Sequence, residues 1–300
     1  MKRNRLLAYS ALAVVCIVWG TTYLGIRVGV ATFPPLFFSV FRMLLAGTLI
    51  LIVFHRRIRW QDLTLKTLGQ QTIAGLFMFG IGNGLVSVAE VGISSGLASI
   101  IGSMSPIWVM VFNRIMNPKE KITSGLILGT LTGLLGIYLI FGGSMADTDH
   151  ATAWGVLAMF TAVLAFAGGS VWIKIRKLAG DPFGTAAIQM VSGGLLLLPV
   201  SAFTEDWSGI TFDTKSILVI GYLVVFGSLL GYFCYLYAIR RLPVTLVSIY
   251  SYINPVVAVL LGWLLLNEPL TGRMILGMAI TLAGVWLVNR GITLRRFWSK

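Results

Sequence analysis

The sequence contains few charged residues and many apolar ones. Charged side chains make up 11% of its 300 residues, hydrophobic side chains make up 57%, and the mean hydropathy is +0.90. Soluble domains have roughly 25% charged and 45–50% apolar residues. This composition excludes a water-soluble globular domain and predicts a protein that lies in a lipid bilayer.

The residue types that carry most enzyme and metal chemistry are also scarce. The sequence has only two cysteines and two histidines, which are Cys16, Cys234, His55 and His150. Both cysteines lie in apolar stretches, where two isolated thiols predict neither a disulfide framework nor a metal cluster. The chain has no G-x-x-x-x-G-K-[ST] motif and no H-E-x-x-H motif, so a P-loop ATPase and a zinc peptidase of that type are excluded. We expect no cofactor, no metal site and no catalytic residue.

Ten stretches are apolar and long enough to cross the hydrocarbon core, which takes about 20 residues of helix. They cover residues 6–28, 34–54, 69–91, 95–116, 122–141, 152–173, 184–203, 215–238, 244–266 and 272–291. The short connections leave no room for a soluble domain. The first stretch is longer than the apolar region of a signal peptide and nine more follow it, so we expect it to be retained. The predicted fold is an all-α polytopic membrane protein with ten transmembrane helices.

The net charge of +13 is explained by where the Lys and Arg residues lie. One side of the predicted bundle, which includes both termini, collects 19 of the 23: Lys2, Arg3, Arg5, Arg56, Arg57, Arg59, Lys66, Arg114, Lys119, Lys121, Lys174, Arg176, Lys177, Arg240, Arg241, Arg290, Arg295, Arg296 and Lys300. The positive-inside rule places this side and both termini in the cytoplasm. The charge therefore reflects topology, and we expect no nucleic-acid partner.

The chain resembles itself at an offset of 148 to 149 residues. SSGLASIIGSMSP (94–106) aligns with PVTLVSIYSYINP (243–255), and after a slip of one residue 120–141 aligns with 268–289. This self-similarity indicates a repeated unit, which we place at residues 1–145 and 146–300. Each unit has five predicted spans, and because five is odd the second unit enters the membrane from the opposite side. The sequence thus predicts two inverted five-helix repeats.

Inverted repeats with interrupted helices are the architecture of secondary transporters, whose halves rock around a central site. Pro106 and Pro255 occupy matching positions near the centre of the fourth span of each unit, and they leave the carbonyls of Gly102 and Ser251 without a helical donor. Such carbonyls are tolerated when protein, water or ligand satisfies them. We expect both prolines to act as hinges of the site-forming helices, with a direct carbonyl contact to substrate and a plain packing role as the alternatives.

Two charged residues fall within the apolar spans. Arg42 lies near the middle of the second span, where an arginine must face the protein interior and find a partner. Glu90, near the outer end of the third span, is the nearest carboxylate in sequence, so we predict that the two residues pair directly or through water. A structural tie between helices and a substrate-binding role are both open for Arg42. For Glu90 the alternative is a side chain that extends to the interface.

Polar and aromatic residues in the middle of the spans are candidates for lining a cavity. We expect substrate-binding positions at Trp19, Asn83, Trp108, Gln189, Tyr252 and Asn254. For the aromatic residues the alternative is packing or an interfacial belt. Asn83 lies among three glycines, so a cross-helix hydrogen bond is its alternative role. The position of the second unit that aligns with Arg42 is close to Gln189, so the charge is not repeated there.

Four segments resemble a known family. These are WGTTYLGIRVG (19–29), PPLFFSVFRMLLAG (34–47), GNGLVSVAE with SSGLASII (82–101) and SYINPVVAVLLGWLLLNEPLTG (251–272). They are similar to the EamA-type transporters of the drug/metabolite transporter superfamily, and the likeness covers nearly the whole chain. The turn NPKEK (117–121) departs from the family in lacking the usual Gly-Glu. The resemblance implies export of amino acids or other small metabolites across a bacterial inner membrane, through a cavity shaped by the first, third and fourth helices of each half.

The sequence therefore predicts a secondary transporter that exports amino acids or similar small amphipathic metabolites by alternating access. We expect a monomer or weak homo-oligomer in the bacterial inner membrane, whose partners are a small-molecule substrate and the lipid bilayer. Protons are the candidate coupling ion, through Glu90. The alternatives are a passive facilitator or channel for small solutes, and a membrane enzyme or scaffold.

Overall fold

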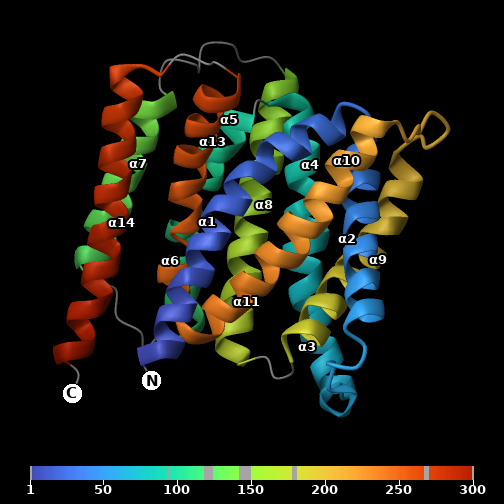
Figure 1. Cartoon of the computed structure of the whole chain (residues 1–300), viewed down its shortest axis with the longest axis horizontal. Helices are drawn as coiled ribbons and strands as arrows, with labels where there is room; N and C mark the ends of the chain where they lie inside the picture. Colours follow the sequence, from blue (N-terminus) through green and yellow to red (C-terminus); the bar gives the residue numbers. More distant parts are fainter. Residues whose placement is uncertain are drawn as a thin grey trace.

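The structure is a computed structural model that describes residues 2–93, 95–117, 124–141, 150–177, 181–266 and 270–298. Within these residues every regular element is a helix, and the helices pack side by side (Figure 1). The start of α1 and the end of α14 lie at the same end of the bundle, at the bottom of Figure 1. The predicted boundary between the two units, at residues 145 and 146, lies outside the described residues.

The elements follow one another along the chain with short connections. They are α1 (Lys2–Val30), α2 (Pro35–Val53), η1 (Trp60–Asp62), α3 (Leu65–Gly75), η2 (Leu76–Asn83), α4 (Gly84–Gly92), α5 (Ser95–Gly102), α6 (Ser105–Met116), α7 (Ser124–Phe141), α8 (His150–Arg176), α9 (Pro182–Thr204), α10 (Thr214–Tyr222), η3 (Leu223–Leu230), α11 (Gly231–Arg241), α12 (Val244–Val247), α13 (Tyr250–Leu266) and α14 (Gly272–Trp298).

The described residues include eight helical segments that are long and apolar enough to cross a membrane, and two shorter apolar helices. The shorter two are 124–140 and 272–288, which belong to α7 and α14. Each of the ten apolar stretches expected from the sequence corresponds to one of these segments, with ends that differ by a few residues. The all-helical membrane fold is therefore confirmed.

Two of the long segments change their helical winding at corresponding places. The segment α3–η2–α4 has eight π-helical residues in its middle, Leu76–Asn83, and α10–η3–α11 has eight as well, Leu223–Leu230. The two π segments begin 147 positions apart. A π-helix is rare and tends to occur at functional sites, because the wider turn redirects side chains and frees backbone carbonyls.

The two proline-containing segments are interrupted. Residues 103–104 form a turn between α5 and α6, so that Pro106 lies in the first turn of α6, where its missing N–H has no cost. In the second segment the turn is at residues 248–249, between α12 and α13. Pro255 lies six residues later inside α13. Both proline-containing segments are thus interrupted by a turn. Only in the first segment does the turn lie close before the proline.

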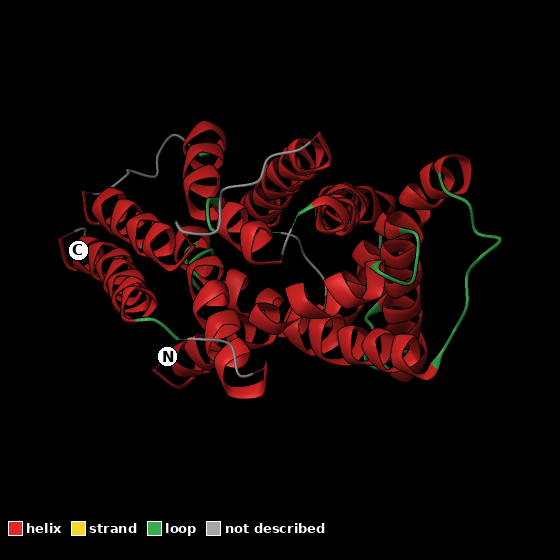
Figure 2. Ribbon diagram, turned by 90° about the horizontal axis from the view of Figure 1, so that it is seen from above, coloured by secondary structure: helices red, strands yellow, loops and turns green. Residues whose placement is uncertain are grey.

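The bundle contains two pairs of helices that pack along their lengths. α2 packs against α9, and α7 packs against α14, at opposite sides of Figure 1. The helices α1, α8, α11 and α13 lie between these pairs: α1 packs against α11 and α13, and α11 also contacts α8. Seen from above, the helices surround a central region, with the start and the end of the chain at the same side (Figure 2).

Two carboxylates join the ends of the α2–α9 pair. Glu205, just after α9, accepts hydrogen bonds from the first amides of α2: Leu36 N to Oε1 at 2.7 Å and Phe37 N to Oε2 at 2.7 Å. At the other end, Asp181 accepts from the amide of Arg59 at 3.0 Å and also caps α9 by accepting from Gly184 N at 2.8 Å. A carboxylate satisfies the exposed N–H groups and the positive dipole end of a helix. The pair is therefore held at both ends.

The α7–α14 contact depends on glycine. A Cβ atom on Gly284 would lie 2.5 Å from the backbone nitrogen of Gly133 and 2.7 Å from the carbonyl oxygen of Gly129. Small residues allow such close backbone approach, which favours helix association in a membrane. The contact between α7 and α14 leaves no room for a side chain at Gly284, because the neighbouring atoms belong to the backbone of α7.

We predict that Gly284→Ala destabilises the protein. The added methyl group would force the two helix backbones apart, and overpacking of this kind costs about 1–3 kcal/mol. The matched control is Gly272→Ala in the same helix, because Gly272 has open space where its Cβ would lie. The measurement is the thermal unfolding midpoint of both purified variants in detergent. Equal midpoints for the two variants would contradict the close contact.

Candidate functional site

A cavity of about 110 Å³ lies among the central helices. Its wall is formed by residues from α1, α2, η2, α4, α5, α6, α8, η3, α11 and α13, so both halves of the chain contribute to it. Both π segments and both interrupted segments reach the wall. A concave site lined by apolar and aromatic side chains, with a few polar groups that converge on it, is typical of small-molecule binding.

Trp19 of α1 is the centre of an aromatic group on this wall. Its ring packs edge-on against Tyr250 at 4.9 Å and against Phe166 at 5.7 Å between ring centroids. Its indole N–H donates to the carbonyl of Gly227 in the π segment η3, at 3.0 Å. The absence of a side chain at Gly231 permits this approach, because a Cβ there would lie 2.4 Å from the indole nitrogen. Trp19 is therefore held in place with its ring facing the cavity.

Arg42 and Asn83 form a polar group on the cavity wall. The Nη2 of Arg42 donates to Oδ1 of Asn83 at 2.5 Å, and the side-chain amide of Asn83 donates to the carbonyl of Met78 in the π segment η2 at 3.0 Å. The guanidinium also lies 5.8 Å from the centre of the Phe38 ring, within the range of a cation–π contact. Arg42 is 3% exposed, and its Nε has no hydrogen-bond partner.

Glu90 of α4 is fully buried, and neither carboxylate oxygen has a hydrogen-bond partner. Arg42 and Arg27 are the cations that interact with it electrostatically. Within the described residues no ion pair or hydrogen bond joins the side chains of Arg42 and Glu90, because Arg42 donates to Asn83 instead. Arg27 donates to the backbone carbonyls of Glu90, Val91 and Ile93 at the end of α4. Glu90 lies behind the cavity wall and not on it.

The interrupted helices place four related residues on the wall. Gly102 and Ser251, whose carbonyls lose their helical donor to the prolines, both line the cavity, and so do Ser105 and Asn254. The members of each pair are 149 positions apart, which is the offset of the sequence repeat. Asn254 is 2% exposed, and its Oδ1 has no hydrogen-bond partner. Pro106 and Pro255 each follow directly after one of these wall residues.

The structure divides the six residues expected to bind substrate into two groups of three. Trp19, Asn83 and Asn254 lie on the wall with Arg42, whereas Trp108, Gln189 and Tyr252 lie away from it. Trp108 packs against Phe112 and Phe160. Tyr252 is fully buried against α7 and donates its hydroxyl to the carbonyl of Thr130 at 3.4 Å.

Gln189 belongs to a buried hydrogen-bond network beside the cavity. Its Nε2 donates to Oε1 of Gln71, and its Oε1 accepts from the hydroxyl of Tyr232, which is on the cavity wall. The network continues through Thr185, which accepts from Gln71 Nε2 at 3.4 Å and from Arg240 Nη2 at 2.9 Å. Gln189 thus positions a wall residue without touching the cavity itself.

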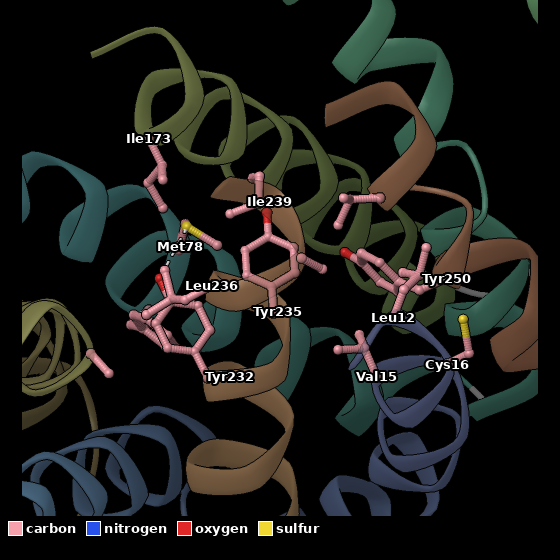
Figure 3. Packing of buried hydrophobic residues seen from close by; sticks show 14 of the residues in the cluster. Leu12, Val15, Cys16, Met78, Ile173, Tyr232, Tyr235, Leu236, Ile239 and Tyr250 are labelled. Carbon is pink, nitrogen blue, oxygen red and sulfur yellow. Dashed lines mark hydrogen bonds between the residues drawn. The ribbon is translucent and has the colours of Figure 1, made fainter. Parts of the chain in front are cut away.

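A layer of tyrosines separates the cavity from the packed core. Tyr232 and Tyr250 line the cavity, and Tyr235 lies between them, stacked at 5.6 Å on Tyr232 (Figure 3). Beyond this layer, Leu12 and Val15 of α1 are buried in the hydrophobic core, on the side of the N-terminal end of that helix. Packed side chains therefore lie between this part of the cavity and the end of the bundle that holds the termini.

The sequence interpretation missed the part of the wall contributed by α8. Met159, Ala162, Val163 and Phe166 line the cavity at spacings that correspond to one face of a helix. Phe166 lies 147 positions after Trp19 and contacts it. The sequence repeat was therefore the signal that could have identified this face of α8. A residue of the second unit that corresponds to a wall residue of the first unit is itself a candidate for the cavity wall.

Comparisons with known proteins agree with this architecture. The model of the EamA-like transporter family matches residues 6–142 and again residues 153–290. The uncharacterized inner membrane transporter YedA of Escherichia coli (strain K12) is 32% identical over 297 residues, which cover 96% of this chain and 92% of YedA. An uncharacterized transporter of Archaeoglobus fulgidus is 27% identical, over 94% of this chain and 98% of its own. A solved crystal structure shares the fold with a TM-score of 0.77, at 16% identity and over 99% of both chains.

A membrane-embedded helical bundle around a cavity with converging polar groups is the architecture expected of a membrane transporter. The chain belongs to the EamA-like transporter family. The resemblance seen in the sequence is thereby confirmed, and it indicates a transporter and not an enzyme.

We predict that Gln189→Leu lowers stability. The substitution removes the acceptor of the Tyr232 hydroxyl and the donor to Gln71, and a buried polar group that loses its partner costs about 1–3 kcal/mol. The control is the same substitution at Gln61, which is exposed in η1. Thermal unfolding in detergent measures both. If the two variants unfold at the same temperature, the network does not stabilise the fold.

Proposed function

We propose that the protein is a secondary transporter that exports amino acids or similar small amphipathic metabolites across the bacterial inner membrane by alternating access. The observation that supports this most directly is the construction of the cavity. Two π segments and two interrupted helices, at corresponding positions of the sequence repeat, contribute to one wall. Discontinuous helices around a central site are the usual means by which transporter halves move relative to each other.

The proposed architecture is ten transmembrane helices in two inverted five-helix repeats. Support comes from the 147-residue offset of the π segments and from the two separate matches to the family model. In this topology the start of α1 and the end of α14 share the cytoplasmic side, which agrees with the basic residues Arg56, Arg176 and Arg240 near that end of the bundle. Pro106 and Pro255 are the proposed hinges.

With cytoplasmic termini, the tyrosine layer and the core beyond it lie between the cavity and the cytoplasm. The conformation is then one in which the cytoplasmic side is closed. Trp19, Asn83 and Asn254 are proposed to contact substrate directly. Gln189 is proposed to affect substrate binding by positioning Tyr232. Trp108 and Tyr252 are proposed to affect it by packing the interrupted helices in place.

Proton coupling is assigned to Glu90 in this proposal. The carboxyl group is buried next to two arginines and makes no hydrogen bond, so its protonation can change without breaking a hydrogen bond. Because Arg42 lies both near Glu90 and on the cavity wall, a change of charge at Glu90 reaches the substrate site through electrostatics.

The transport function is tested with proteoliposomes that contain the purified protein. The panel of labelled solutes comprises amino acids and amphipathic metabolites, with and without a pH gradient. Saturable flux that the gradient drives supports a coupled transporter. Flux without saturation or accumulation would instead identify a passive facilitator, and flux that ignores the gradient would identify a uniporter.

We predict that Glu90→Gln removes the dependence of flux on the pH gradient while the protein stays folded, because the amide cannot exchange a proton. The control is Asp206→Asn, which alters an exposed carboxylate in the loop after α9. Flux is measured over a series of gradients for both variants. A gradient dependence in Glu90→Gln equal to that of the unmodified protein would exclude Glu90 from the proton path.

A further inference from the structure

The cavity wall has a single charged side chain among the residues that the structure describes, and it is a cation, Arg42. The other polar groups on the wall are neutral: hydroxyls of serine, threonine and tyrosine, and the amides of Asn83 and Asn254. No carboxylate lies on this wall. The electrostatic field inside the cavity therefore favours a ligand with negative charge.

The guanidinium of Arg42 is only partly used by the protein. One nitrogen, Nη2, donates to Asn83, one face lies near Phe38, and Nε is buried without a partner. An arginine presents several N–H groups in a planar fork that matches the two oxygens of a carboxylate. Burying such a group with unused donors is unfavourable unless an acceptor comes to it. A ligand carboxylate in the cavity would supply that acceptor.

Glu90 is not the acceptor for the unused donors of Arg42. Both of its oxygens are without hydrogen bonds, although it interacts electrostatically with Arg42 and Arg27. Two arginines interact with one carboxyl group in this part of the molecule. The net charge of the three groups is therefore positive even when Glu90 is ionised. The protein itself therefore leaves the Arg42 site open to a further anionic group.

A second unpartnered polar atom belongs to Asn254, a wall residue of α13. Its Oδ1 is buried without a hydrogen bond, and the residue is 2% exposed. This oxygen can only accept, so a donor on a ligand beside Asn254 would satisfy it. The rings of Trp19, Phe166 and Tyr250 form the apolar part of the wall, which suits a ligand with an aromatic or branched body.

We propose that the cavity binds an organic carboxylate with an apolar body. Arg42 binds its carboxylate, Trp19 and its aromatic neighbours contact its body, and Asn254 accepts a hydrogen bond from a donor on the ligand, such as an amino or hydroxyl group. This substrate class rests on the transport function proposed above. A plain carboxylic acid and an amino acid share the group that Arg42 recognises, and the experiment distinguishes them.

The first test needs no substitution. The purified protein in lipid nanodiscs is titrated by calorimetry with phenylalanine, with 3-phenylpropanoate, which lacks the amine, and with phenethylamine, which lacks the carboxylate. We expect both carboxylates to bind at least about 10-fold more tightly than the amine, because a charged group that loses its buried partner forfeits binding of this order. Equal binding of the amine, or no binding of either carboxylate, would overturn the proposal.

The second test assigns the residues. Arg42→Gln should weaken both carboxylates by about 30-fold or more and leave phenethylamine unchanged, while Arg42→Lys should retain part of the affinity. The matched control is Arg273→Gln, which removes an exposed arginine at the start of α14 that is not on the wall. Asn254→Leu should weaken phenylalanine more than 3-phenylpropanoate. An equal loss for all three ligands in Arg42→Gln would contradict carboxylate recognition.

The two proposals can fail separately. Carboxylate binding that depends on Arg42, without flux in proteoliposomes, would refute the proposed transport function and support the proposed carboxylate site. Flux of phenethylamine in preference to both carboxylates, or flux indifferent to Arg42, would refute the site and support transport. If Arg42→Gln does not fold, the selectivity of the unmodified protein decides the question.

Discussion

The structure depends on one constraint: a backbone carbonyl or amide in apolar surroundings must find a partner inside the protein. Helices meet it with their own backbone hydrogen bonds, and at the π segments side chains add further hydrogen bonds. There the indole of Trp19 donates to the carbonyl of Gly227, and the amide of Asn83 donates to the carbonyl of Met78. These two side chains are also on the cavity wall. The irregular backbone and the cavity are thus connected by the same two side chains, which bond to carbonyls of the π segments and also line the cavity.

The helices around this centre differ in how firmly they are joined. α2 and α9 are linked at one end by Glu205 and at the other by Asp181, and the glycine seam brings the backbones of α7 and α14 into contact. Between these pairs, α1, α8, α11 and α13 meet at the aromatic group of the cavity. The contacts at the edges involve backbone atoms, which have little freedom to rearrange. The contacts at the centre involve aromatic side chains beside a cavity, and these side chains have more freedom to rearrange.

The limits of the helices were predictable, and the orientation of their side chains was predictable only in part. Arg42 was expected to face the interior because a charged group cannot face lipid, and it does. Gln189 was expected on the wall as a polar residue within a span, yet it lies in the network with Gln71 and Tyr232. Trp108 was chosen as an aromatic residue in the middle of a helix, but its neighbours are Phe112 and Phe160. A polar or aromatic residue in an apolar helix has several possible partners, and sequence alone does not rank them.

The sequence by itself determined that the chain is a membrane protein, which of its stretches are apolar and long enough to cross the membrane, and that two parts of it resemble each other. These properties follow from hydropathy, helix length and the repeated motifs, which are local along the chain. Tertiary structure decided which helix faces meet, that Asn83 and not Glu90 takes the hydrogen bond of Arg42, and that Asn254 is left with an unused acceptor. Lipid and protein interior are both apolar, so the apolar pattern of a membrane helix carries little information about its rotation. Only the packing of all the helices selects it.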